Sequence, residues 1–283
     1  MSISLPLLAV AALALGQAGV AQTKLLDVLQ DENARDADFW IYNDLAAARA
    51  EAAGLAVKGV SQVQSAGAGY GAQQVFMAAS NGFEGGYRRT DRGLSCVAIA
   101  GSGTGMERDY ERCSRIFQTD LRSPEDIGTK AGERVLERMG ARKPPTGAYP
   151  VLFDERISSA LIGHLLSAIS GTAIARGASW LRDAMGEQVL PKGMSLIEDP
   201  FRPRVAGSRP FDGEGLPTSR RTIVDDGTLQ GWTLDLATAR KLGLTPTGNA
   251  ARGTGSNPGP ATWNIALSQG NATRADLIRD MGT

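Results

Sequence analysis

This chain of 283 residues has no excess of positive or negative charge, a single histidine and only two cysteines. Each of these features limits the binding sites or partners that the chain can have. Thirty Lys and Arg residues balance thirty Asp and Glu residues, so no single-sign field favours nucleic acid or an anionic membrane as a partner. The lone histidine, His164, excludes a metal site built from two histidines of this chain. Cys96 and Cys113 could pair in an oxidising compartment, but two thiols make no disulfide framework and we expect both to stay reduced and inert.

The apolar N-terminal segment, residues 1–22, lacks the basic residues with which a signal peptide begins. It also lacks an apolar run long enough to span a membrane. Its hydrophobic run, Leu5 to Leu15, is too short to span a bilayer as a helix, so we expect no membrane anchor. Gly19-Val20-Ala21 could serve as a signal-peptide cleavage site, yet the first positive charge of the chain is Lys24. The segment is either signal-like or a misassigned start. We expect a cytoplasmic protein, with export as the alternative if residues 1–21 are a true signal.

Residues 23–147 carry the pattern of an antiparallel β-meander with flanking helices. The dipeptide Asn81-Gly82, between two strand-like runs, is the strongest short signal of a hairpin. The Ala-rich stretch Asp44–Ala53 predicts a helix that ends at Gly54. The runs expected to form strands are 73–80, 83–90, 94–100 and 106–117.

A second helix in this region has signals at both ends. Ser123 is its expected N-cap, Pro124 its first residue and Gly140 its stop signal. Lys143–Gly147, which contains two prolines, then breaks regular structure and marks the expected boundary between two domains. The apolar positions of the helix, which recur one turn apart, are Ile127, Ala131, Val135 and Met139.

Residues 148–283 mix helix and strand signals, which predicts a mixed α/β second domain and an α+β fold class for the chain. A helix is expected over Ile157–Ser170, with an apolar stripe that would bury the neighbouring His164. Asp226-Gly227 predicts a hairpin turn. The remaining expected elements are a strand over 149–153 and helices over 179–185, over 237–242 ending at Gly243, and after Thr273, which Asp276 would help to cap.

Three segments could carry chemistry, and the residues alone give each only a weak signal. Gly101–Gly105 lacks the third glycine of a dinucleotide fingerprint and the lysine of a phosphate loop, so we expect a hairpin loop there. His164 is the one possible base of a Ser-His-acid hydrolase, but the chain has no Gly-x-Ser-x-Gly elbow, and we favour a structural histidine. Asp212 and Glu214 lie on a glycine-rich turn that could ligate a cation or pair as acid and base, while a solvated turn is the simpler interpretation.

Six blocks of this sequence resemble the TldD/PmbA family of protein-maturing metallopeptidases, and they follow the family's order from about Ser65 to the C-terminus. The order makes the resemblance more specific than any single block. The features point to the PmbA branch, also called TldE, whose subunits have lost the metal ligands. The blocks are Met106–Tyr110, Leu161–Gly171, Gly186–Pro191, Pro210–Gly215, Ala239–Leu244 and Met281–Thr283.

The resemblance implies that one helix of this chain is a degenerate metal helix. In the catalytic TldD branch, a His-Glu-x-x-x-His helix binds a divalent metal, the glutamate acts as general base, and a thiolate from farther along completes the site. Ser159 stands at the first histidine position, Ala160 at the glutamate position, and only the second histidine survives, as His164. We therefore expect no catalytic residue, no cofactor and no metal on this chain.

The resemblance further implies a heterodimer in which a TldD-type catalytic subunit carries the divalent metal, expected to be zinc, and acts on peptide substrates. The two subunits would enclose a proteolytic chamber, and this chain would supply part of the chamber wall and the surface that binds the partner. Family members begin with a further domain and continue beyond Thr283 into a glycine-rich strand region, so we expect a fragment with a truncated C-terminal domain over 148–283. The alternatives are an exported ligand-binding module, or an active metallopeptidase that uses His164 with Asp212 or Glu214.

Overall fold

The computed structural model describes residues 36–80 and 82–282, and it places them in two compact units. Unit 1 comprises residues up to Gln73 together with Arg89–Lys143, and unit 2 comprises Gln74–Arg88 and the residues from Pro144 onward. Both units combine helices with antiparallel strands, so the α+β fold class is confirmed. No helix in these described ranges is both long enough and apolar enough to cross a membrane. The apolar N-terminal segment lies outside the described residues.

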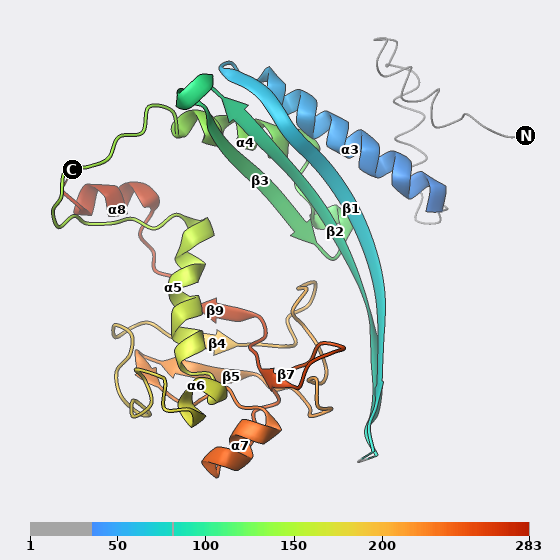
Figure 1. Ribbon diagram of the computed structural model, residues 1–283, viewed down its shortest axis with the longest axis vertical. Helices are drawn as coiled ribbons and strands as arrows, with labels where there is room; N and C mark the ends of the chain where they lie inside the picture. Colours follow the sequence, from blue (N-terminus) through green and yellow to red (C-terminus); the bar gives the residue numbers. More distant parts are fainter. Residues whose placement is uncertain (1–35, 81, 283) are drawn as a thin grey trace, which may run out of the picture. The chain divides into compact units, whose positions relative to one another are not determined.

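Unit 1 contains most of a three-stranded sheet with the order β1-β2-β3 (Figure 1), while the end of β1 and the start of β2 belong to unit 2. Strand β2 pairs antiparallel with β3, from Arg92 opposite Arg115 to Ala100 opposite Glu107. Helices α3 and α4 pack against each other, and α4 also packs on β3. The bounds are α3 Asp36–Ala56, β1 Val60–Ala78, β2 Glu84–Ala100, β3 Glu107–Arg115 and α4 Pro124–Glu137, with short 3-10 turns at Gly103–Gly105 and Gln118–Asp120.

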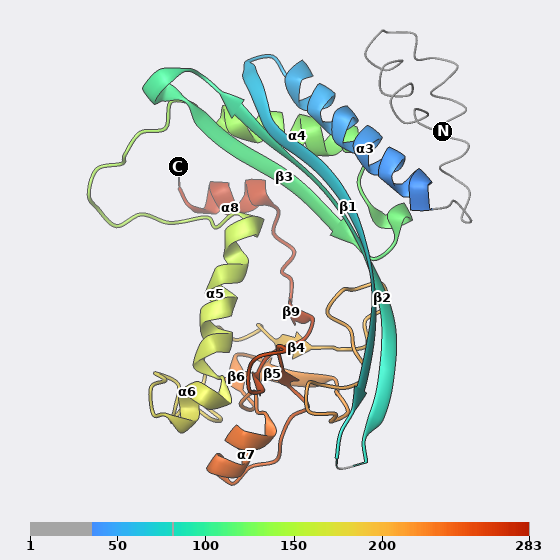
Figure 2. The ribbon, with the colours of Figure 1, turned by 45° about the vertical axis from the view of Figure 1, so that its right-hand side comes forward.

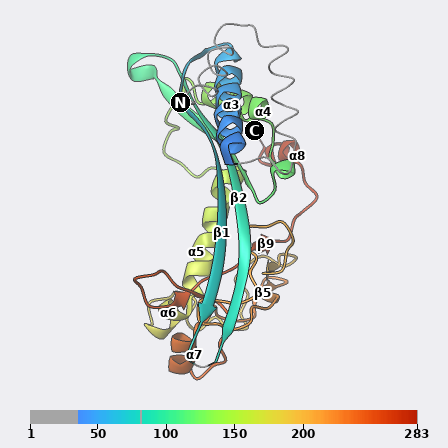
Figure 3. The ribbon, with the colours of Figure 1, turned by 90° about the vertical axis from the view of Figure 1, so that its right-hand side faces the viewer.

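The meander and its hairpins are confirmed, but the number of strands is wrong, because the predicted strands 83–90 and 94–100 form the single strand β2. Strand β1 begins at Val60, well before the predicted residue 73, and β3 is shorter than the predicted run 106–117. β1 and β2 lie side by side along their length (Figure 3), and Ala79 N–H donates to Phe83 O at the turn that joins them. Asn81, the first residue of the predicted turn, lies outside the described residues. Gly101–Gly105 connects β2 to its antiparallel neighbour β3, so this segment is a hairpin loop, as expected.

The second helix prediction is confirmed at its start, whereas the predicted stop of the first helix is wrong. Ser123 Oγ accepts a hydrogen bond from Asp126 N at 3.1 Å, as an N-cap should. Gly54 lies inside α3, which continues to Ala56. Gly54 serves helix packing instead, because a Cβ at this position would lie 3.3 Å from the Gly128 carbonyl oxygen of α4 and 3.4 Å from the Cys96 sulfur.

The core of unit 1 lies between the two helices and one face of the sheet (Figure 2). Cys96 and Cys113 are both buried there with free thiols. Met139, the last position of the predicted α4 stripe, is exposed instead. The core consists of Ala46, Ala50, Leu94, Cys96, Ala98, Ala100, Cys113, Ile127, Ala131 and Val135.

Unit 2 contains a four-stranded antiparallel sheet of order β6-β5-β4-β9 and a two-stranded ribbon of β7 and β8. Helix α6 follows α5 directly in this unit (Figure 2). The helices are α5 Glu155–Ala168, α6 Gly171–Ala175, α7 Leu236–Leu242 and α8 Arg274–Asp280. The strands are β4 Leu196–Glu198, β5 Arg221–Asp225, β6 Thr228–Leu229, β7 Ala250–Ala251, β8 Gly259–Pro260 and β9 Ile265–Leu267.

Local signals predicted three features of unit 2 correctly. Asp226 and Gly227 form the two-residue turn between β5 and β6, and both have positive φ, 44° and 84°, which suits glycine at the second position. Gly243 is the left-handed C-cap of α7. Thr273 and Asp276 form the capping box that starts α8.

Two predicted elements of unit 2 are wrong. The segment 149–153 is irregular, and its side chains Tyr149, Val151 and Phe153 are exposed rather than buried in a strand. Residues 179–185 form turns, and the short helix α6 lies just before them. Ser179 stabilises these turns, because its hydroxyl donates to Ala168 O at 2.6 Å and accepts from Leu181 N at 3.0 Å.

A buried ion pair lies at the centre of unit 2. Arg221 Nε donates to Glu198 Oε2 at 2.5 Å, and Glu198 has only 1% of its side chain exposed. Glu198 Oε1 accepts from Asn249 Nδ2 at 2.9 Å and also from the backbone N–H of Trp263. Around it the apolar core comprises Leu165, Ala168, Ile169, Ile174, Leu181, Leu196, Ile223, Val224, Leu229, Trp232, Leu234 and Ala239.

Replacing Arg221 by methionine should destabilise unit 2 by about 3–5 kcal/mol, because the Glu198 carboxylate would stay buried without its countercharge. The measurement is the free energy of unfolding in urea. Arg220→Met is the matched control, since Arg220 is 61% exposed and its contact to Asp199 is 3.7 Å long. The control should change stability by less than about 0.5 kcal/mol. Equal losses in the two variants would contradict the assignment.

Unit 1 should become less stable at alkaline pH, because the buried thiol of Cys96 ionises there. Burial, and secondarily the negative charge of Glu51, raises the pKa of the Cys96 thiol from an ordinary value of 9.0 to about 11. The folded state therefore favours the protonated thiol, and this contribution is complete below pH 9 and is lost as the pH rises to about 11. The difference in unfolding free energy between wild type and Cys96→Ala should fall over this interval. A pH-independent difference would show that ionisation of this thiol plays no part.

Candidate functional site

Helix α5 carries the residues that the sequence singled out as a degenerate metal helix. Its start is fixed by Asp154, whose Oδ1 accepts a hydrogen bond from Arg156 N at 3.0 Å. Only the C-terminal half of the helix is anchored in the core, through Leu165 and Ala168. In the N-terminal half the apolar side chains of Ile157 and Leu161 are 57% and 50% exposed.

The prediction that His164 is buried in an apolar stripe is wrong, because the side chain is exposed. The predicted apolar stripe is covered only in part, since Leu165 and Ile169 are buried whereas Ile157 and Leu161 are exposed. A sequence period, however, does not tell how far along a helix its apolar face is covered. In unit 2 the core covers only the face of the helix that carries Ile162, Leu165 and Ala168, so a surface histidine takes the place of the structural one we expected.

Ser159 and Ala160 are exposed on the same helix as His164, and this set does not fit a divalent metal. The hydroxyl of Ser159 is neutral and the methyl group of Ala160 offers no ligand, whereas protein zinc sites are built from imidazole, thiolate or carboxylate groups. Residues 36–80 and 82–282 contain no group of three or more His, Cys, Asp and Glu side chains arranged to hold a metal ion. No chemical step can therefore be assigned to a metal on these residues.

Asp212, the first carboxylate of the glycine-rich turn, supports the backbone. It is 2% exposed. Its Oδ1 accepts hydrogen bonds from Glu214 N and Leu216 N, both at 2.9 Å, and its Oδ2 accepts one from Ala250 N at 2.9 Å. The neighbouring Phe211 is also buried, and its ring lies 4.9 Å from that of Phe83. The turn is thus packed and hydrogen bonded at Phe211 and Asp212, so the interpretation as a solvated turn is wrong for these two residues.

Glu214, the second carboxylate, accepts a hydrogen bond from Leu236 N at 2.8 Å, at the start of α7. Burial is the main reason that its pKa is raised, and the nearby charges of Asp235 and Asp212 raise it further, against the lowering effect of the Leu236 bond. Asp235 has a structural role of its own, because it caps α7 through Thr238. The three acids therefore stabilise turns and helix starts within unit 2.

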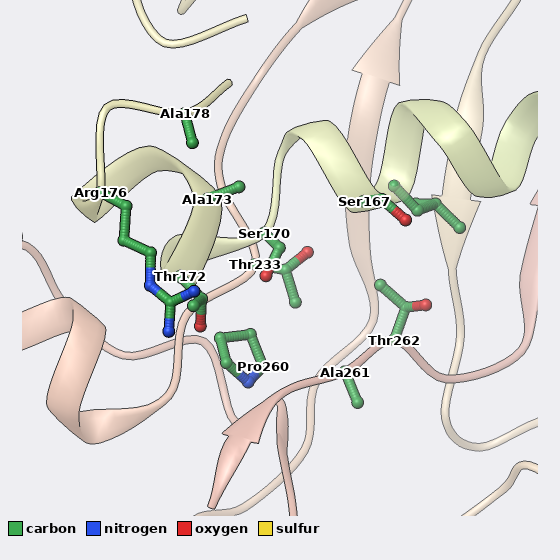
Figure 4. Close-up of a pocket in the computed structure, with 11 residues that line it drawn as sticks. Ser167, Ser170, Thr172, Ala173, Arg176, Ala178, Thr233, Pro260, Ala261 and Thr262 are labelled. Atoms are coloured by element: carbon green, nitrogen blue, oxygen red, sulfur yellow. The ribbon is translucent and has the colours of Figure 1, made fainter. Parts of the chain in front are cut away.

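A pocket of about 470 Å³ opens beside the C-terminal end of α5 (Figure 4). Helix α5, helix α6, Thr233 and the segment 260–262 form its wall. No sequence motif indicates this pocket, because its lining comes from segments far apart in the chain. Hydroxyl groups dominate its polar lining: Ser167, Ser170, Thr172, Thr233 and Thr262, with Arg176 at the side.

Comparison with known proteins finds the same family relationship in both parts of the chain. Residues 31–139 match the PmbA/TldA metallopeptidase central domain, and residues 146–283 match the PmbA/TldA metallopeptidase C-terminal domain. The metalloprotease PmbA of Escherichia coli O157:H7 is 38% identical over 204 residues, which are 72% of this chain and 43% of that protein. The chain therefore spans less than half the length of this relative.

Solved structures agree with this relationship. A proposed modulator of a DNA gyrase from Thermotoga maritima MSB8 superposes with a TM-score of 0.76 at 26% identity, covering 84% of this chain and 54% of that one. TldE from Thermococcus kodakarensis superposes with a TM-score of 0.61 at 20% identity, covering 75% and 48%. The latter likeness concerns the fold.

Asp212→Asn should cost unit 2 about 1–3 kcal/mol, because the amide NH2 group would face backbone N–H donors that the carboxylate now satisfies. Glu214→Gln on the same turn is the matched control. It should be neutral or stabilising at pH 7, since burial raises the Glu214 pKa and ionisation works against folding. Any gain should vanish as the pH falls and Glu214 becomes protonated. Urea unfolding measures both, and an unchanged stability in Asp212→Asn would contradict the structural role.

Proposed function

Because the chain belongs to the PmbA/TldD metallopeptidase family, we propose that it acts as the PmbA-type, non-catalytic subunit of a complex that processes peptides. The partner in this proposal is a TldD-type subunit, which forms a heterodimer with this chain and supplies both the divalent metal, zinc, and the general base. This chain supplies part of the wall of the proteolytic chamber and the surface that binds the TldD-type partner. The chain spans less than half the length of its E. coli relative. The activity, the substrates and the partner of the complex are therefore all part of this proposal.

The observation that carries the proposal is the composition of α5. Two of the three positions expected to serve the metal are Ser159 and Ala160, which offer neither an imidazole nor a carboxylate. His164 is exposed and belongs to no metal-binding group within the described ranges. A single imidazole provides one ligand where a catalytic zinc takes three from protein. The helix fold is thus kept while the ligand set is incomplete.

Exposed apolar side chains in the same region support an assembled state. Tyr149, Val151, Phe153, Ile157 and Leu161 are all large, apolar and at least 45% exposed. Several large apolar side chains exposed within one short segment are typical of a surface that is buried against another segment or subunit. We also propose a cytoplasmic location for this subunit.

Purification of the tagged chain from its native cells should yield a complex with a TldD-type subunit and with about one metal ion per partner subunit. Mass spectrometry identifies the partner, and metal analysis of the complex and of its separated chains locates the ion. His164→Ala should leave metal content and peptide cleavage by the complex unchanged, because the imidazole is not a ligand in this proposal.

The control is removal of the metal from the wild-type complex by a chelator, which should abolish peptide cleavage while the two chains stay together. A metal that stays with this chain after separation, and is lost in His164→Ala, would overturn the proposal in favour of an active metallopeptidase. Recovery of the chain without any TldD-type partner would overturn it as well.

A further inference from the structure

The wall of the α5–α6 pocket has a charge of one sign. Arg176 is its only ionisable lining residue, and neither Asp nor Glu is among the described residues that line it (Figure 4). Within the described part of the chain, no ion-pair or hydrogen-bond partner is found for the Arg176 guanidinium, which is exposed just after α6. A positive charge beside a wall without carboxylates favours an anionic ligand.

One pocket hydroxyl is held in place by the buried ion pair of unit 2. Arg221 Nη2 donates to Thr233 Oγ1 at 2.8 Å, and Arg221 Nη1 donates to Trp232 O at 2.8 Å. Thr233 is 2% exposed. Because the Thr233 hydroxyl oxygen already accepts a hydrogen bond from the guanidinium, its own O–H group is left to donate elsewhere. Thr233 lies next to Ser170, to which it forms a parallel bridge, at the wall of the pocket (Figure 4).

The remaining lining decides which kind of anion fits. A single guanidinium balances one negative charge, and its planar fork matches the two oxygens of a carboxylate. Leu166, Ala173 and Pro260 add apolar surface, which a bare inorganic anion would leave uncovered. A volume of about 470 Å³ lies within the range of small-molecule pockets and suits a few amino-acid residues.

We propose that this pocket binds the C-terminal end of a short peptide, with the terminal carboxylate on Arg176 and the peptide groups on the hydroxyls of residues such as Thr233 and Thr262. The choice of a peptide rests on the proposed function, whereas the preference for a carboxylate rests on the lining. The pocket then selects peptides by a free C-terminus and holds them next to the exposed half of α5.

Calorimetric titration of the purified 283-residue chain with trialanine tests the proposal. The free acid should bind about tenfold more tightly than trialanine amide, because the amide lacks the charge-assisted contact. Arg176→Gln should weaken binding of the free acid by about tenfold and should abolish the preference over the amide. Thr262→Val should weaken both peptides alike, because it removes a hydroxyl and leaves the charge in place.

Arg240→Gln is the matched control, since Arg240 is an exposed arginine of α7 outside the pocket lining and its loss changes the net charge equally. It should leave binding unchanged. Equal binding of acid and amide, no binding of either, or the same affinity in Arg176→Gln would each overturn the proposal. Displacement of trialanine by an equal concentration of inorganic phosphate would also overturn it, in favour of a general oxyanion site. These outcomes are separate from the search for a metal-bearing partner, because they concern this chain alone.

Discussion

The buried contact between Glu198 and Arg221 is the interaction on which unit 2 depends. One oxygen of Glu198 binds Arg221 of β5, and the other binds Asn249, just before β7, and Trp263, just before β9. A buried carboxylate is tolerable only with such partners, so one side chain fixes both the four-stranded sheet and the β7–β8 ribbon. Arg221 extends the constraint to the pocket, because the same guanidinium holds Thr233. The geometry of the pocket wall is therefore tied to the stability of the sheet.

The sequence predicted the features that depend on neighbouring residues. The N-cap at Ser123, the turn at Asp226-Gly227 and the capping box at Thr273 were all found, because each is decided by a few adjacent side chains. The exposure of His164 and the packing of Asp212 were missed, since both depend on segments far away in the chain. A periodic row of apolar residues can be buried, and a pair of carboxylates can bind a cation or act as acid and base. Tertiary contacts decide whether either happens.

The pocket is the clearest case of this limit. Its residues run from Leu166 to Thr262, and no local motif joins Arg176 with Thr233. Serine and threonine residues are common on surfaces, so their presence at positions 167, 170 and 262 carries no signal before the fold brings them together. The pocket is therefore visible only in the fold, whereas the degenerate metal helix follows from the family resemblance and from the residues at positions 159, 160 and 164.

Burial also explains how α5 can keep its fold without a ligand set. The residues that anchor the helix, Leu165 and Ala168, lie in its C-terminal half, while positions 159 and 160 are exposed. Exposed helix positions contribute little to stability, and alanine is the best helix former, so Ser and Ala at these positions cost the fold almost nothing. The pocket, by contrast, is built on the anchored half. Metal ligation and the pocket are therefore separable properties of one helix, and a subunit can lack the first while keeping the second.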